Sequence, residues 1–412
     1  MSQNYKVLTS PGKIGSMTLR NRMVLAAMGS NFAEADGSCS EKLIAYYEER
    51  ARGGAGLLVL ETSAACFPNG STMPFTVGFS RDDFLPGLTE LAQRVHRHGA
   101  KIVAQLNHGG KMAQEDTAAG RHIPLPSILR PAASDMFKVL TREEIGNFIK
   151  AAGPDGKGPQ YFEMSETDIA EIVSGFAAAA ARAQRAGFDG VEIHAGHGYL
   201  IASFLSPYSN KRSDGYGGSR ENRARFLCEI IRATRQATGP DFPILVRLDA
   251  KEYRMDGGIT PEDCVATAQL CEQAGADAID VSAYGNVAHA IAFTEAPLVH
   301  EPGGFIEFAR KVKQAVSVPV IGVGRIEPEV AEKHLAAGDF DFLAMGRKLL
   351  ADPQLPAKLT SGNAQQIRPC IYCYICVSQI FINRPMMCAV NSDMGREWEG
   401  KLIATSEARK NT

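Results

Sequence analysis

Residues 243–283, PILVRLDAKEYRMDGGITPEDCVATAQLCEQAGADAIDVSA, contain two short apolar runs separated by one helical pattern. The runs PILVRLDA (243–250) and AIDVSA (278–283) are nearly continuous in apolar residues, which is typical of parallel strands buried on both faces. Between them, PEDCVATAQLCEQAG (261–275) ends in glycine, the residue that most often follows the last turn of a helix. The stretch therefore predicts a strand–helix–strand unit of an α/β protein.

The same unit recurs along the chain often enough to predict a closed barrel. Eight apolar runs alternate with helical segments, which is the number that a TIM (β/α)8 barrel requires. An open doubly wound sheet is the alternative, but the number of units favours closure. The predicted strands are residues 23–28, 56–62, 101–107, 190–195, 243–250, 278–283, 319–324 and 341–346.

Composition limits the class of protein. The 412 residues are 45% hydrophobic and 22% charged, as in an ordinary globular protein with a large core. A net charge of −2 does not indicate the basic surface that binds nucleic acid or an anionic membrane. No apolar run approaches the ~18 residues that span a bilayer, and the N-terminus lacks the pattern of a secretory signal. We therefore expect a cytoplasmic protein that acts on a small molecule, with neither nucleic acid nor membrane as a partner.

Two Gly-Arg pairs follow the last two predicted strands, in GVGRI (322–326) and MGRKL (345–349). Barrels often bind phosphate at the loops after strands 7 and 8, where glycine lets backbone N–H groups approach the anion and arginine adds bidentate charge. The alternative is that glycine marks tight turns and arginine pairs with surface acids. Their position in the barrel favours a phosphate site.

The segment IHAGHGYLIASFLSP (193–207) places His194, His197 and Tyr199 at the end of the fourth strand. Imidazole N–H groups can bind a carbonyl oxygen and stabilise enolate charge, and a phenol can donate a proton to carbon. A His-x-x-His metal pair and satisfied core histidines are the alternatives. No cluster of carboxylates stands beside the motif, and Glu192 is expected to face the helices, which weakens the metal interpretation.

Four cysteines lie close together near the end of the sequence, in the pattern Cys-x2-Cys-x2-Cys-x11-Cys. In a reducing compartment such a cluster indicates a metal or redox site, not disulfides. Four thiolates suffice for a [4Fe–4S] cluster or a zinc ion, and the three-residue intervals favour iron–sulfur. The predicted ligands are Cys370, Cys373, Cys376 and Cys388.

Three stretches together resemble a known family: PGKIGSMTLRNRMVLAAM, HAGHGYLIASFLSPYSNKRSDGYGGSRENRARF (194–226), and GVGRI with MGR. They are similar to the old yellow enzyme superfamily of FMN-dependent oxidoreductases. The cysteine cluster resembles its iron–sulfur branch, that of bacterial 2,4-dienoyl-CoA reductase and trimethylamine dehydrogenase, whose N-terminal half this chain matches. The resemblance covers residues 7–395.

The resemblance implies two cofactors, FMN and a [4Fe–4S] cluster held by the four cysteines. It also implies a role for each matching residue around the flavin. Arg247 would put positive charge near N1 and the C2 carbonyl, and Gln105 would bind the pyrimidine part of the ring. The remaining implied flavin contacts are Ala26, Ala27, Met28 and Thr62 along the ring, and Gly324, Arg325, Gly346 and Arg347 at the phosphate.

The implied activity is that of an ene-reductase. His194 and His197 would hold the carbonyl of an unsaturated carbonyl or enoyl substrate, and Tyr199 would supply the proton. Asp249 departs from the pattern, because ene-reductases usually have serine there, and an acid at the strand end could recognise a cationic substrate. An amine dehydrogenase or oxidative N-demethylase is therefore the alternative activity. A purely structural explanation of Asp249 is an ion pair at the barrel rim. The third hypothesis is a barrel without redox chemistry that holds a structural zinc.

Iron–sulfur relatives continue into a C-terminal half with a GxGxxG dinucleotide-binding unit, and no strand–GxGxxG–helix unit occurs here. We expect residues 1–360 to form the FMN-binding barrel and residues 361–412 to form the [4Fe–4S] segment, the start of a further domain. NAD(P)H would then be the ultimate electron donor through a domain or partner outside this chain. An electron-transfer flavoprotein or a dinucleotide-binding protein would serve, and we also expect a homo-oligomer.

Overall fold

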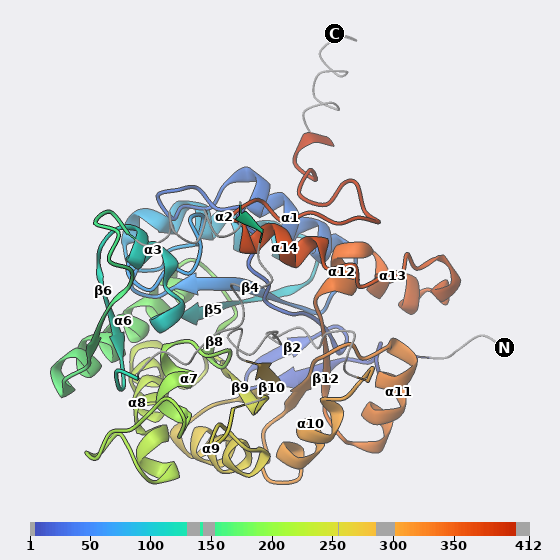
Figure 1. The fold of residues 1–412 in the computed structure, drawn as a ribbon. Helices are drawn as coiled ribbons and strands as arrows, with labels where there is room; N and C mark the ends of the chain where they lie inside the picture. Colours follow the sequence, from blue (N-terminus) through green and yellow to red (C-terminus); the bar gives the residue numbers. More distant parts are fainter. Residues whose placement is uncertain (1–4, 130–140, 143–152, 254, 286–300, 401–412) are drawn as a thin grey trace.

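The computed structural model describes residues 5–129, 141–142, 153–253, 255–285 and 301–400. Eight parallel strands close into a barrel, which confirms the predicted TIM barrel (Figure 1). The closed order is β10-β11-β12-β3-β4-β5-β8-β9, so barrel strands that follow one another in the chain are neighbours around the barrel. The barrel strands are β3 (Met23–Leu25), β4 (Leu57–Ala64), β5 (Lys101–Asn107), β8 (Gly190–Ala195), β9 (Ile244–Tyr253), β10 (Ala278–Gly285), β11 (Val320–Gly322) and β12 (Phe342–Met345).

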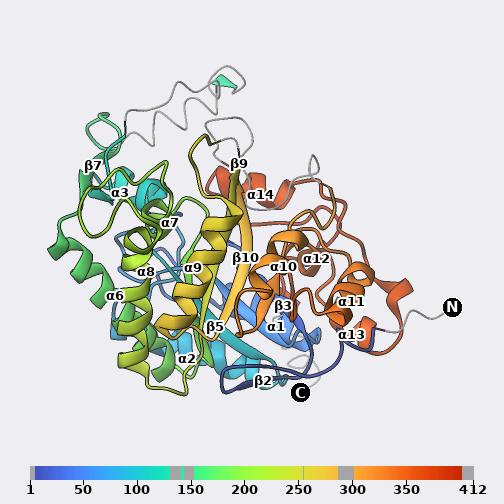
Figure 2. The same ribbon diagram turned by 90° about the horizontal axis from the view of Figure 1, so that it is seen from below.

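Helices surround the strands as an outer layer, as the two views in Figures 1 and 2 show. The longer helices are α1 (Glu41–Arg52), α2 (Leu85–His96), α6 (Glu166–Arg185), α8 (Arg220–Thr238), α9 (Pro261–Ala274), α10 (Ile306–Lys313) and α11 (Pro328–Ala337). The shorter helices are α3 (Gln114–Ala118), α7 (Leu200–Leu205), α12 (Arg347–Ala351), α13 (Leu355–Thr360) and α14 (Ile375–Phe381). Two small sheets pair β1 (Gly12–Ile14) with β2 (Met17–Leu19), and β6 (His122–Leu125) with β7 (Gln160–Glu163).

The quoted stretch 243–283 folds as the predicted unit of β9, α9 and β10. Thr260 caps the start of α9, because its side chain accepts from the Asp263 N–H while the Asp263 carboxylate accepts from Thr260. Gly275 ends the helix with φ 107°, a left-handed conformation that favours glycine. The chain then returns so that Ala278 of β10 pairs with Leu245 of β9.

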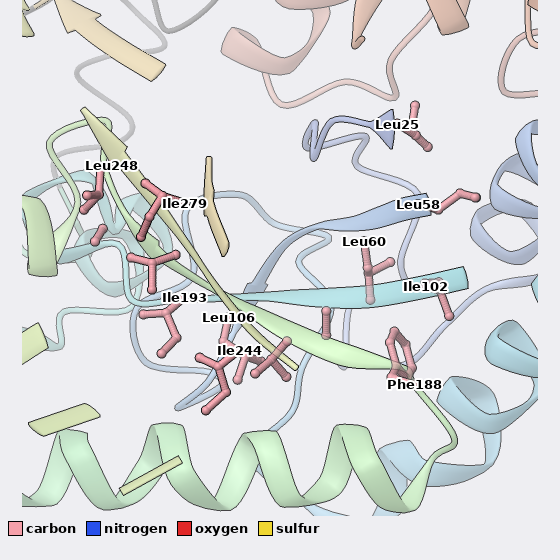
Figure 3. Close-up of a cluster of buried hydrophobic side chains, with 14 of the residues drawn as sticks. Leu25, Leu58, Leu60, Ile102, Leu106, Phe188, Ile193, Ile244, Leu248 and Ile279 are labelled. Carbon is pink, nitrogen blue, oxygen red and sulfur yellow. The ribbon is translucent and has the colours of Figure 1, made fainter. Parts of the chain in front are cut away.

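Alternation along the strands separates two hydrophobic layers. Side chains such as those of Leu58, Leu60, Ile102 and Leu106 belong to the large core between the barrel and its helices (Figure 3). The alternate positions, among them Leu57, Val59, Val103, Leu245 and Ala278, form a second cluster inside the barrel. Ile14, Met17 and Leu19 of the β1–β2 hairpin are part of that inner cluster, so the hairpin closes the end of the barrel where the strands begin.

The segment after α13 lies against the loop that follows β3 and against α12, at the end of the barrel where the strands finish (Figure 1). The Met386 N–H donates to the Ser30 carbonyl (2.9 Å), and the Asn31 side chain donates to the Arg384 carbonyl (3.2 Å). Asn391 donates to the carbonyl of Leu350 in α12 (2.8 Å). Residues 401–412 of the predicted iron–sulfur segment lie outside the described residues. No helix in the described part of the chain is both long and apolar enough to cross a membrane.

Candidate active site

One cavity opens at the ends of the barrel strands, and the residues predicted to bind flavin and substrate carbonyl surround it. The ten predicted flavin contacts and the three predicted catalytic side chains all line this cavity. Cys376 of the cysteine cluster also lines it, whereas Asp249 does not. The structure thus brings the predicted residues together from strands that are far apart in sequence. Their individual roles stay predictions.

His194, His197 and Tyr199 form a compact group on one wall of the cavity. The ring centroids of the two histidines are 4.7 Å apart, and Tyr199 lies 4.9 Å from His194 and 6.4 Å from His197. His194 comes from the last part of β8, and the other two rings come from the turn that leads into α7. His197 has φ 60°, a left-handed backbone that is uncommon outside glycine but that histidine adopts more often than most residues. The turn therefore curls the second histidine back beside the first.

Both histidines are held in the neutral form. Burial lowers the pKa of His194 well below its usual value, and the positive charge of Arg247 lowers it further. Burial also lowers the pKa of His197, with additional contributions from His194 and Arg247. The Gly196 N–H donates to Nδ1 of His194 (3.2 Å), so the neutral ring carries its proton on Nε2. His194 can therefore donate a hydrogen bond from Nε2 without bringing a cation into the site.

Asp249 lies beneath this turn. Its Oδ2 accepts a hydrogen bond from the His197 backbone N–H (2.5 Å), and its Oδ1 lies 3.6 Å from Nε2 of the same histidine. The carboxyl is fully buried, and burial raises its pKa well above the usual range. Ser282 contacts His197 from the other side, with Oγ 2.9 Å from Nε2. Asp249 and Ser282 thus fix both the backbone and the ring of His197.

A polar layer lies inside the barrel, one step below the histidines. Gln105 donates to Glu192 (2.7 Å) and accepts from Thr62 (2.9 Å), and Arg247 lies 3.1 Å from Asp280. The prediction that Glu192 faces the helices is wrong, because Glu192 and His194 are two residues apart on one strand and therefore share a face. Burial raises the pKa of Glu192 to about 8.

This polar layer has the chemistry that the ring of a flavin needs. Arg247 lines the cavity, and its buried Nε has no hydrogen-bond partner among the described residues. A buried N–H donor of this kind is costly unless it binds an acceptor, and the flavin N1 and C2 carbonyl are acceptors. The residues present therefore fit the ring of FMN.

The opposite wall of the cavity carries the two Gly-Arg pairs. Gly324 has φ 109°, and a Cβ there would lie 2.6 Å from the Phe305 ring, so only glycine fits without displacement. A Cβ on Gly346 would lie 2.7 Å from the Met28 sulfur. Arg325 and Arg347 follow these glycines and line the same cavity. Glycines that admit close backbone approach beside two arginines fit a phosphate group.

The four clustered cysteines lie next to this wall and differ in exposure. Cys376 is buried, Cys373 is exposed, and Cys370 and Cys388 are intermediate. Burial raises the pKa of the Cys376 thiol to about 11, and nearby Cys370 and Cys388 contribute to the same shift. In the part of the chain that the structure describes, no three His, Cys, Asp or Glu side chains are grouped closely enough for a metal ion. A [4Fe–4S] cluster binds each thiolate to a different iron and so spans more widely separated ligands than one zinc ion. The number of thiols fits such a cluster, and Cys370 and Cys388 lie near enough to Cys376 to act on its pKa, while the cluster itself stays a prediction.

Two tyrosines of the cavity wall were missed by the sequence analysis. Tyr284 lies near the end of β10, a strand end from which no candidate was taken, although that position alone is a sufficient signal in a TIM barrel. Tyr372 lies between Cys370 and Cys373, and the cysteine pattern predicts a role only for the cysteines themselves. Nothing in the local sequence indicates that Tyr372 faces the cavity, since it reaches that wall through a long-range contact.

Comparison with known proteins identifies a family whose sequence pattern this chain matches. The model of the "NADH:flavin oxidoreductase / NADH oxidase family" matches residues 7–366. An NADH oxidase of Thermoanaerobacter brockii is 40% identical, over 99% of this chain and 59% of its own length. An N,N-dimethylglycine/sarcosine dehydrogenase of Chromohalobacter salexigens is 32% identical, over 98% of this chain and 56% of its own.

A solved structure of 2-naphthoyl-CoA reductase in complex with 2-naphthoyl-CoA superimposes with a TM-score of 0.84. It is 32% identical, and the match covers 96% of this chain and 58% of the reductase. The chain thus spans less than two thirds of the length of each of these relatives.

Proposed function

The chain belongs to the NADH:flavin oxidoreductase / NADH oxidase family, and from that membership we propose that it is an FMN- and iron–sulfur-dependent ene-reductase. Its substrate class would be a C=C bond conjugated to a carbonyl group, as in an unsaturated ketone, acid or thioester. The observation that carries the proposal is the group of two neutral histidines and one tyrosine on one wall of the cavity. The similarity to a reductase of an aromatic thioester supports the same substrate class.

The two histidines would act on the carbonyl oxygen of the substrate, and the tyrosine would act on its α-carbon. N–H groups of His194 and His197 bind the carbonyl oxygen and stabilise the negative charge that develops there. Because both rings are neutral, they donate hydrogen bonds without protonating the oxygen outright. Reduced FMN, when bound, supplies the hydride that forms the new C–H bond at the β-carbon. Tyr199 donates its phenolic proton to the α-carbon, which completes reduction of the C=C bond.

The chain's other residues hold this arrangement in place. Asp249 and Ser282 orient His197, so that the second donor does not depend on a flexible turn. The interior layer of Gln105 and Arg247 would bind the pyrimidine edge of the flavin ring, and the two Gly-Arg pairs would bind its phosphate. Substrate would therefore enter between the flavin and the histidine wall.

Electrons would reach the flavin from NAD(P)H through a [4Fe–4S] cluster at Cys370, Cys373, Cys376 and Cys388. The position of Cys376 in the cavity wall supports this path, since it leaves no protein layer between the cluster ligand and the flavin site. The donor would act through a domain or partner outside this chain, either a dinucleotide-binding unit or an electron-transfer flavoprotein.

An amine dehydrogenase is the second candidate, supported by the similarity to N,N-dimethylglycine/sarcosine dehydrogenase. In that case a buried acid at Asp249 would recognise the amine cation. We rank it second because the Asp249 side chain is fully buried, does not line the cavity and already accepts from the His197 backbone.

The test is an anaerobic comparison of the two half-reactions on protein whose flavin and iron contents have been measured. Photoreduced enzyme is mixed with cyclohexenone, cinnamate or crotonyl-CoA, and oxidised enzyme is mixed with dimethylglycine or trimethylamine. Reoxidation of the flavin by an unsaturated carbonyl, with solvent deuterium at the α-carbon of the product, is expected. Bleaching by a methylated amine without reoxidation by any unsaturated carbonyl would replace this proposal with the second. Protein without flavin would exclude both.

A further inference from the structure

Two tyrosines in the cysteine segment adopt an unusual backbone conformation. Tyr372 and Tyr374, on either side of Cys373, have φ 52° and φ 62°. Large side chains rarely occupy this left-handed region, which glycine and asparagine adopt more readily. A strained conformation persists only where the surrounding contacts fix it, so the contacts of these two rings require an explanation.

Both rings lie against the arginines of the opposite wall. The guanidinium carbons of Arg325 and Arg347 are 4.8 Å and 5.1 Å from the centroid of the Tyr372 ring. Arg347 also lies 5.0 Å from the Tyr374 ring. These distances are those of cation–π contacts, in which the face of the aromatic ring attracts the guanidinium. Each arginine is therefore held by an aromatic residue of the cysteine segment.

The hydroxyl of Tyr372 makes a second set of contacts. It accepts a hydrogen bond from Nζ of Lys348 and donates to Oε1 of Glu327 (3.1 Å). Lys348 follows Arg347 directly in the first turn of α12, the helix after β12, and Glu327 is the residue before α11, the helix after β11. One side chain between two cysteines thus contacts both chain segments that follow the Gly-Arg pairs.

We propose that Tyr372 is a positioning residue that holds Arg325 and Arg347 for the phosphate of FMN and thereby couples flavin binding to the cysteine cluster. The inference rests on the proposed function, because it requires FMN phosphate at the two Gly-Arg pairs. Arginine side chains are long and flexible, and fixing them before the phosphate arrives lowers the entropy cost of binding. Since Tyr372 lies between Cys370 and Cys373, FMN that orders the ring also orders the cluster ligands. The coupling is reciprocal, so an assembled cluster strengthens FMN binding by the same factor.

The test compares FMN with riboflavin, which has the same ring but no phosphate. Dissociation constants for both are measured by flavin fluorescence on deflavinated wild type, Tyr372→Gly, Tyr372→Phe and Ile371→Ala, with iron content as a second reading. Tyr372→Gly removes the ring and relieves the backbone strain, and Tyr372→Phe keeps the ring. Ile371 is 57% exposed and serves as the matched control in the same loop.

Tyr372→Gly is expected to weaken FMN binding about tenfold, as loss of two cation–π contacts implies, and to leave riboflavin binding unchanged. Tyr372→Phe and Ile371→Ala should stay within about threefold of wild type. FMN should also slow the loss of iron to a chelator in wild type but not in Tyr372→Gly.

Four results would overturn the inference. Unchanged FMN affinity in Tyr372→Gly would show that the ring does not position the arginines. Equal weakening of FMN and riboflavin, together with lost iron, would indicate a general structural role. Wild-type protein that binds FMN no better than riboflavin would remove the phosphate site itself. Wild-type protein that binds neither flavin would overturn the proposed function along with the inference.

Discussion

The two walls of the cavity are built in different ways. The proposed carbonyl wall comes from one continuous stretch, in which His194, His197 and Tyr199 lie within six residues of sequence and the ring of His194 packs edge to face with the other two. The phosphate wall combines the loops after β11 and β12 with a tyrosine from the cysteine segment. The first wall is neutral and buried, and the second carries several positive charges.

Under the proposed function, this difference separates the two tasks of the site. Chemistry at carbon requires donors at fixed positions and without net charge, and a short turn anchored in a buried strand provides them. Binding of a phosphate requires positive charge near solvent, and long side chains provide it once a neighbouring ring restrains them. Substitutions on the first wall should therefore change turnover, whereas those on the second should change cofactor affinity.

The largest effect is expected for Tyr199→Phe. Removal of the proposed proton donor should lower the rate of flavin reoxidation by an unsaturated carbonyl by roughly 10²- to 10⁴-fold, because a positioned acid contributes that much. Flavin content should stay at the wild-type level, since Tyr199 belongs to the carbonyl wall. Stopped-flow spectroscopy of photoreduced enzyme with cyclohexenone measures the rate. Tyr216→Phe, a tyrosine bonded to Glu229 away from the cavity, is the control. Wild-type rates in Tyr199→Phe would assign the proton to another group.

A smaller loss is expected for His194→Ala and His197→Ala. Each removes one hydrogen-bond donor to the carbonyl oxygen, which should lower kcat for reduction by roughly 10²- to 10³-fold. The affinity for FMN should change little, in contrast to Tyr372→Gly on the opposite wall. Steady-state kinetics and flavin titration of the same preparations measure both quantities. His122→Ala, an exposed histidine of β6, is the matched control. A loss of FMN without a loss of kcat would contradict the division between the walls.

The same comparison explains what the sequence could predict. The carbonyl wall follows from local order, because strand alternation and a compact motif place His194, His197 and Tyr199 at the end of β8. Glu192 shows the limit of that interpretation, since the expectation that it faces the helices conflicts with its position two residues before His194 on the same strand. The barrel itself was predictable because each strand–helix unit carries its own pattern, as in residues 243–283.

The phosphate wall was predictable only in part. The Gly-Arg pairs follow β11 and β12, so their location is given by the barrel, but their partner Tyr372 lies 25 residues after Arg347 and 47 residues after Arg325. No periodicity links a residue between two cysteines to arginines on two strand ends. Asp249 is a related case, because its contact with the His197 backbone depends on how two strand ends meet in space.

Asp249 should show an intermediate effect that depends on the substituted side chain. Asp249→Asn keeps an oxygen that can accept from the His197 N–H, so reduction of cyclohexenone should stay within about threefold of wild type. Asp249→Ala removes the acceptor beneath a strained turn and should lower kcat about tenfold. Asp256→Asn, an exposed acid, controls for surface charge.

The amine alternative predicts no difference between the two Asp249 variants. A carboxylate that binds an amine cation would lose amine turnover in Asp249→Asn as completely as in Asp249→Ala. Turnover of dimethylglycine and of cyclohexenone by both variants therefore separates a positioning role from a substrate-binding role.

The smallest effect concerns stability in acid and again distinguishes the walls. The pKa values of His194 and His197 lie well below the unfolded value of 6.5, so the unfolded chain binds more protons than the folded one below that pH. The contribution of these two histidines to the free energy of unfolding is therefore fully present above pH 6.5 and is lost progressively as the pH decreases. Each neutral histidine contributes about 1.4 kcal/mol per pH unit once the unfolded ring is fully protonated.

His197→Asn should accordingly reduce the slope of unfolding free energy against pH by about 1 kcal/mol per pH unit between pH 5.0 and 6.5. Urea titrations followed by circular dichroism at several pH values measure the slope, and subtraction from wild type cancels the other titrating groups. Tyr372→Gly removes no group that titrates in this range, so its slope should equal that of wild type even if its stability differs. A reduced slope in Tyr372→Gly, or an unchanged one in His197→Asn, would mean that burial of neutral histidine is not what sets the carbonyl wall apart.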